Sequence, residues 1–158
     1  MAVLTGFVFM CAGNVLHMNI AFAAEPKDMG GWEKNSPYNR LYNPSEMDRI
    51  KGHVEKITEI VPMPGMAPGV AIILRQSKSE TVEVHVCPSW YIDANNTGLK
   101  KGDSLKIRGS WAEVGDNFVF MASKIKRGDF FELKVRLTKD GTPFWTMSPE
   151  ELEREKSQ

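Results

Sequence analysis

Cysteine is scarce in this sequence, with two residues among 158. That number excludes a disulfide-stapled scaffold and a four-cysteine zinc site. An excess of one charge sign is also missing, because 20 Lys and Arg side chains balance 20 Asp and Glu side chains. Dedicated nucleic-acid-binding proteins usually carry a clear basic excess, so no nucleic-acid partner is expected. Nucleotide-binding loops, zincin helices and nucleophile elbows are absent as sequence motifs, and we predict that the protein is not an enzyme.

The composition is that of one ordinary globular domain, with 42% hydrophobic and 25% charged residues. The first 24 residues, by contrast, contain no charged side chain and end in Ala21-Phe22-Ala23-Ala24 before Glu25. Small residues at alternate positions before a polar stretch are typical of a signal-peptidase site, although the usual positive start is missing. We predict that residues 1–24 are an export signal, which gives a periplasmic protein without membrane contact after cleavage. An uncleaved anchor is the alternative, since 24 uncharged residues can span a bilayer.

Three segments follow the predicted signal. Residues 25–47 are rich in Pro, Gly and Asn, which is typical of irregular structure, yet Trp32, Tyr38 and Tyr42 are too apolar for a free linker. We expect this arm to pack on the domain, or else to dock on a partner. Residues 48–137 form the predicted barrel. Residues 138–158 form a tail in which Ser148-Pro149-Glu150-Glu151 predicts the capped start of a short helix.

Alternating apolar and polar residues predict five or six short strands between residues 48 and 137. The alternation is cleanest at Val82, Val84 and Val86, and a slip of phase after Val54 predicts a bulge in a long first strand. Residues 88–96 favour a short helix between strands three and four, with Ser89 as its cap. A short sheet leaves costly edges unless it closes, so we predict an all-β fold, a small OB-fold-like barrel.

A family resemblance supports this fold. The patterns at residues 50–54, 82–84, 101–110 and 122–125 are IKGHV, VEV, KGDSLKIRGS and ASKI. Together they resemble exported bacterial OB-fold proteins of the BOF kind over residues 48–127. The resemblance implies a periplasmic binding or accessory module and no catalytic residues.

A soft-metal site is one candidate for chemistry. His85 and Cys87 stand two apart on one predicted strand and should point to the same face. Imidazole and thiolate ligands suit zinc or copper, and the Met63-x-x-Met66 loop would add thioethers that favour Cu(I). The alternative is a small buried cysteine, a surface histidine and methionines that pad a proline-rich loop. Two ligands on one face do not make a closed site, so we expect no cofactor, with copper as the alternative.

A binding face for a polymer is the second candidate. Trp90, Tyr91 and Trp111 would form an aromatic platform for a sugar, a nucleic acid or a peptide, on the face that OB barrels use. The alternative is that Trp90 and Tyr91 plug one end of the barrel. Seven basic side chains would add a stripe for single strands: Lys100, Lys101, Lys106, Arg108, Lys124, Lys126 and Arg127.

The sequence therefore predicts an exported, non-enzymatic OB-fold binding or accessory module of the cell envelope. Its aromatic arm and the single cysteine outside the predicted signal favour a protein partner. Copper binding and binding of a single-stranded nucleic acid or glycan are the alternative functions.

Overall fold

The computed structural model describes residues 28–157, so the predicted export signal lies outside the described residues. Six strands and one α-helix occur within this range. The strands are β1 (Met47–Ile60), β2 (Gly69–Arg75), β3 (Thr81–Pro88), β4 (Ser104–Val114), β5 (Asn117–Arg127) and β6 (Phe131–Lys134), and the helix is α1 (Pro149–Lys156). Single 3-10 turns occur at η1 (Asn39–Leu41), η2 (Pro44–Glu46), η3 (Ala94–Asn96) and η4 (Phe144–Thr146).

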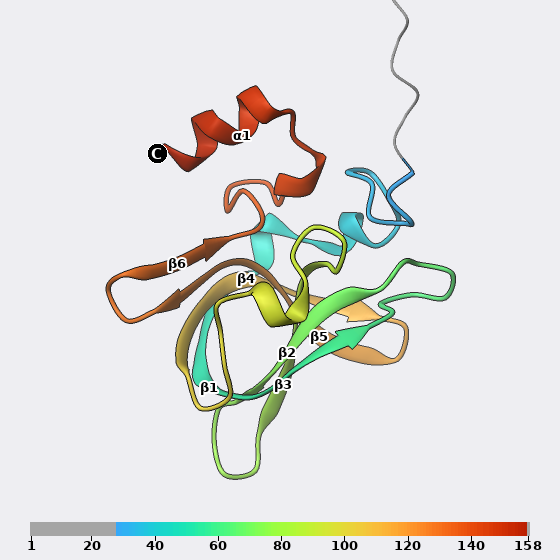
Figure 1. Ribbon diagram of the computed structural model, residues 1–158. Coiled ribbons are helices and arrows are strands. Elements are labelled where there is room, and N and C mark those ends of the chain that lie inside the picture. Colours follow the sequence, from blue (N-terminus) through green and yellow to red (C-terminus); the bar gives the residue numbers. More distant parts are fainter. Residues whose placement is uncertain (1–27, 158) are drawn as a thin grey trace, which may run out of the picture.

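The strands form one sheet that closes on itself (Figure 1). The long strand β1 pairs with β4 through its first half and with β2 through its second half, both antiparallel. β2 continues to β3, and β4 continues to β5. β3 then lies parallel to β5, where Val84 is opposite Phe120 and His85 is opposite Met121. The resulting circuit β1-β2-β3-β5-β4-β1 is the strand order of an OB barrel and confirms the predicted all-β fold.

β1 takes part in both halves of the barrel because it bends. The pairing of β1 with β2 shifts register between Val54 and Lys56, which confirms the bulge predicted from the slip of phase. Gly52 lies at the same bend, and a side chain there would collide with the carbonyl oxygen of Arg75. A glycine at this position therefore lets the two strands approach closely.

The barrel interior is filled by aliphatic side chains that alternate along each strand. β-Branched residues dominate, and they fit the pleated surface of a sheet well. The most deeply buried members include Ile50, Val54, Val70, Ile72, Leu74, Val84, Val86, Leu105, Ile107, Val119, Phe120 and Ile125. This closed core holds the outward-facing side chains of β1, β4 and β5 in a fixed register.

The arm before β1 lies between the barrel and the C-terminal segment (Figure 1). Trp32 is fully buried, and its indole Nε1 donates to the carbonyl oxygen of Ala67 at 2.9 Å. The Trp145 indole donates to the Trp32 carbonyl oxygen, also at 2.9 Å. The Trp32 ring meets Tyr38 edge-on, with 4.9 Å between ring centroids. Trp32 thereby joins three separate segments of the chain.

Two local features differ in detail from the sequence prediction. Between β3 and β4 the chain forms only the 3-10 turn η3, and Asp93 rather than Ser89 caps it by accepting from the Asn95 amide. The predicted barrel extends to residue 137, but its last strand, β6, ends at Lys134, because the Val135 and Arg136 amides both donate to the Ser123 carbonyl oxygen. The two segments concerned are the connection between β3 and β4, and the turn that follows β6.

The C-terminal helix is the one that the sequence predicts. Ser148 caps α1, Pro149 occupies its first turn, and Glu151 completes the capping box. None of its residues is fully buried, and the helix lies outside the barrel (Figure 1). Across residues 28–157, no helix has the length and apolar character that a membrane crossing requires.

We predict that Trp32→Ala lowers the free energy of unfolding by about 3–5 kcal/mol, because it removes a buried ring that joins the arm to the barrel. Urea denaturation measures this change. Phe130→Ala is the matched control, since the Phe130 side chain is fully exposed and its truncation should change stability by less than about 0.5 kcal/mol. Equal effects of the two substitutions would show that the arm is not part of the folded unit.

Candidate binding groove beside strand β6

The barrel has an open seam along β6. One edge of β5 pairs with β4 over most of its length. Its other edge is shared, because Phe120 and Met121 pair with β3, whereas residues 124–127 pair with β6. β3 and β6 are therefore not hydrogen-bonded to each other. Over Phe131–Lys134, the outer edge of β6 faces no strand within the described part of the chain.

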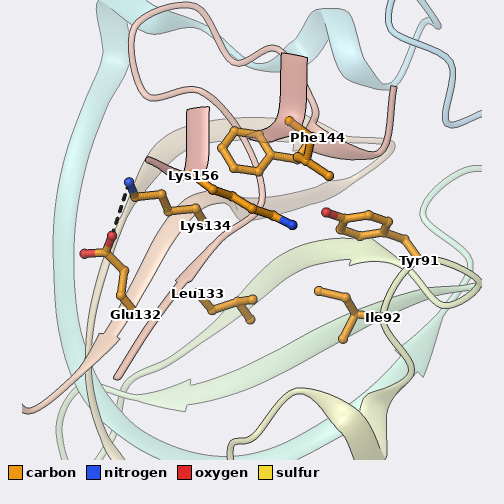
Figure 2. Close-up of a pocket in the computed structure, with 8 residues that line it drawn as sticks. Tyr91, Ile92, Glu132, Leu133, Lys134, Phe144 and Lys156 are labelled. Carbon is orange, nitrogen blue, oxygen red and sulfur yellow. Dashed lines mark ion pairs between the residues drawn. The ribbon is translucent and has the colours of Figure 1, made fainter. Parts of the chain in front are cut away.

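A groove of about 560 Å³ lies at this seam (Figure 2). Its apolar walls come from three places: the connection after β3, strand β6 itself, and the C-terminal segment. The lining residues are Tyr91, Ile92, Glu132, Leu133, Lys134, Phe144, Leu152 and Lys156. The volume falls within the range of about 300–1,000 Å³ that ligand-binding sites occupy.

Two ammonium groups flank the apolar walls. Lys134 pairs at 3.5 Å with Glu132, two residues earlier on β6. Lys156 extends from α1 across the groove, and its ammonium end points toward Tyr91 (Figure 2). Lys156 forms an ion pair at 3.5 Å with Glu153, which is exposed on α1. The groove thus combines an apolar surface, an unpaired backbone edge and positive charge, a combination that suits an extended peptide with acidic side chains.

Tyr38 of the arm forms a polar cluster with Glu83 and His85 of β3. His85 is 2% exposed and uses both ring nitrogens. Its Nε2 lies 2.7 Å from a Glu83 carboxylate oxygen, and its Nδ1 lies 2.9 Å from the Tyr38 hydroxyl. Since a carboxylate only accepts, Nε2 carries the proton and Nδ1 accepts from Tyr38. Burial lowers the pKa of His85 below its ordinary value of 6.5, against the opposing effect of Glu83. The cluster fastens the arm to β3.

The four predicted metal ligands each make separate contacts. They are His85, Cys87, Met63 and Met66. A register shift in the β2–β3 pairing sets Cys87 opposite Val70 and His85 opposite Ala71. Cys87 is buried with its thiol 3.8 Å from the Ile92 carbonyl oxygen, and burial raises the pKa of the Cys87 thiol to about 12. Met63 and Met66 pack against the core, and Met66 also faces Gly31. Among residues 28–157, no group of three or more His, Cys, Asp and Glu side chains could hold a metal.

Copper binding therefore stays a prediction that the geometry does not support. A metal would have to displace a hydrogen bond from His85 and deprotonate a buried thiol that favours its neutral form. His85 is also not the surface residue that the alternative reading expected. The arm covers the outer face of β3, and that cover buries the histidine.

The predicted aromatic platform is divided between two clusters. Trp90 and Tyr91 meet edge-on with 6.5 Å between centroids, and Tyr91 also faces Trp145. Trp111, on β4, instead stacks on Phe118 at 4.9 Å and donates its indole N–H to Asp48. Only Tyr91 of the three lines the groove. The Tyr91 ring is half-buried and Trp90 is 43% exposed, so the plug interpretation stays a prediction.

Sequence reasoning missed most of the groove. Leu133 and Lys134 belong to the last strand of the predicted barrel. That this strand has an unpaired edge follows only from the pairing of β5 with β3, which the sequence does not reveal. Phe144, in η4, and Leu152, in α1, line the groove because the C-terminal segment returns to β6, and no local pattern in the sequence predicts that contact. The one usable signal was the capping box at Ser148, which predicts a helix close after the last strand.

Comparisons with known proteins point to a family. The model of a family described as the MamS/MamX magnetosome protein family matches residues 46–131, which include β1–β5. No curated protein matches. A crystal structure of the S. pombe Stn1-ten1 complex is similar at a TM-score of 0.42 and 8% identity, covering 61% of this chain and 77% of that chain. The fold assignment rests on the strand order instead. Nothing in these matches points to the BOF-like proteins in particular.

We predict that folding stability falls as the pH drops below about 6.5, because unfolded His85 takes up a proton that the buried side chain refuses. The loss should approach about 1.4 kcal/mol per pH unit between the unfolded pKa and the lowered folded pKa. Urea unfolding between pH 7.5 and 5.5 measures the slope. His85→Gln should flatten it, whereas His53→Gln, at an exposed site on β1, should leave it unchanged. A slope that persists in His85→Gln would assign the effect to another group.

Proposed function

The chain belongs to the MamS/MamX magnetosome protein family, and from this premise we propose that it is an exported, non-enzymatic binding module that serves an assembly of the magnetosome. The partner is a protein, and the module takes an extended segment of it into the groove beside β6. The observation that carries this proposal is the coincidence of that groove with the unpaired edge of β6.

The chemistry of the groove selects the segment. An extended chain that adds to a strand edge places alternate side chains toward the groove wall and away from it. The wall offers Leu133, Ile92 and Phe144, so apolar side chains should face it. Lys134 and Lys156 also line the groove and outnumber its one carboxylate, Glu132, so acidic side chains should alternate with the apolar ones. The preferred partner is thus an acidic segment with apolar residues at every second position.

Export fits the state of the remaining cysteine. If residues 1–24 are removed, Cys87 is the only cysteine of the mature chain. A lone thiol in an oxidising compartment is a hazard when it is exposed and ionised. Cys87 is buried, and the raised pKa of its thiol keeps it neutral. The folded domain can therefore tolerate an oxidising compartment without a second cysteine.

A non-enzymatic role fits the way in which the titratable groups are used. Tyr38, His85 and Glu83 form a hydrogen-bonded chain that resembles a catalytic relay. A nucleophile must reach its substrate, yet the Tyr38 side chain is buried and burial raises its pKa above the ordinary value. The chain of contacts is thus accounted for as the attachment of the arm to β3.

Export predicts a mature chain that begins at Glu25. Intact-mass and N-terminal measurements on protein isolated from the native cell should find residues 1–24 removed. Ala23→Leu combined with Ala24→Leu should block the cleavage, because the signal-peptidase pocket accepts only small side chains directly before the cut. A native chain that retains its first 24 residues would contradict export with cleavage and would favour the anchor.

Peptide selection against the folded chain tests the groove. Dodecamers selected from a random display library should alternate apolar and acidic residues, and their binding should shift the backbone amide signals of residues 131–134 in NMR spectra. Lys134→Glu combined with Lys156→Glu should weaken the selected peptides at least tenfold, since both lysine charges of the groove are reversed.

Lys100→Glu combined with Lys139→Glu is the matched control. Both residues are exposed, neither lines the groove, and the change in net charge is the same. This variant should keep the affinity within twofold. Selected peptides that shift signals elsewhere, or that lose equal affinity in both double variants, would overturn the proposed groove.

A further inference from the structure

A second hollow, on the outer face of the barrel, is lined almost wholly by positive charge. Its volume is about 330 Å³, and three adjacent strands, β1, β4 and β5, form its walls. Six of the eight lining residues are basic and the other two are isoleucines: Arg49, Lys51, Lys106, Arg108, Lys124 and Lys126, with Ile50 and Ile107. No acidic residue lines it.

The strand register places like charges directly opposite each other. Arg49 is paired with Arg108, and Arg108 is paired in turn with Lys124. Lys106 is likewise paired with Lys51 on one side and with Lys126 on the other. The result is a grid of two rows across three strands, with neighbouring strands about 4.8 Å apart and successive rows about 6.7 Å apart. Like charges at directly opposed positions destabilise a sheet.

The protein balances this charge at one end only. Glu132, on β6, pairs with Lys126 at 3.0 Å and with Lys124 at 3.8 Å. The other four cations, Arg49, Lys51, Lys106 and Arg108, form no ion pair with any residue of the described range. A sheet face that accumulates repulsion without internal compensation indicates a ligand that supplies the negative charge.

We propose that this hollow binds a small anion that carries two or more phosphate groups. Arg49 and Arg108 present planar guanidinium groups, which bind phosphate oxygens in pairs, and the lysines add point charges around them. A single phosphate can contact only part of a grid that spans three strands. An anion with linked phosphate groups can neutralise both rows at once, and a hollow of this size accommodates it.

The surroundings of the hollow argue against larger anionic partners. Binding of a single-stranded nucleic acid needs aromatic rings on which bases stack, and the apolar lining consists of Ile50 and Ile107 alone. A membrane surface is bound most firmly when apolar side chains insert beside the cations. The exposed large apolar residues of the described chain are Val61, Trp90, Phe118 and Phe130, and none of them lines the hollow.

Calorimetric titration with inorganic tripolyphosphate tests the proposal on the full chain. Tripolyphosphate should bind at least tenfold more tightly than inorganic phosphate, and its affinity should fall as the salt concentration rises from 20 to about 200 mM. Lys51→Gln combined with Lys106→Gln should weaken tripolyphosphate at least tenfold. Without ligand, the same variant should unfold at an equal or higher temperature than the wild type, because a repulsive pair is gone.

Lys100→Gln combined with Lys101→Gln is the control, since it removes two exposed charges that do not line the hollow. It should change tripolyphosphate affinity less than twofold. Equal losses in both double variants, or no tripolyphosphate binding at low salt, would overturn the site. Binding of anionic phosphatidylserine vesicles or of a thymidine oligonucleotide, with no binding of tripolyphosphate, would also overturn it in favour of a membrane or a nucleic acid.

Discussion

The closure of the barrel depends on a short parallel contact between β3 and β5. Only two residue pairs make it, Val84 with Phe120 and His85 with Met121. A contact this short is weak by itself, and parallel pairing is slightly less stable than antiparallel pairing. The arm reinforces it from outside, because Tyr38 hydrogen-bonds to His85 and stacks beside it. The packing of Trp32 and Trp145 then holds the arm in place.

Both candidate sites follow from the way this closure uses β5. Because β3 occupies only the first part of one β5 edge, β6 takes the remainder and leaves its own outer edge open. The opposite edge of β5 continues into β4 and β1, and their outward side chains form the basic hollow. Glu132 touches both places, since it lines the groove and pairs with two lysines of the hollow. The two candidate sites therefore share one carboxylate.

Much of the fold could be predicted from the sequence because it depends on local alternation. The bulge after Val54 and the helix cap at Ser148 are local signals, and both are confirmed. The burial of His85 is not local, because the cover over it comes from an arm 47 residues earlier in the chain. The sequence predicts only part of the basic hollow. Lys106, Arg108, Lys124 and Lys126 were recognised as a stripe, whereas Arg49 and Lys51 joined it only through the register of β1 with β4.

Hydrogen exchange resolved by residue tests the closed barrel most directly. The amides of Val84–Val86 and Phe120–Ala122 should exchange only through global unfolding, with protection equal to that of the most stable residues of β1. The outward-facing amides within Phe131–Lys134 should exchange orders of magnitude faster, as expected of an unpaired edge. Fast exchange at the β3–β5 contact, or full protection along both edges of β6, would contradict the account.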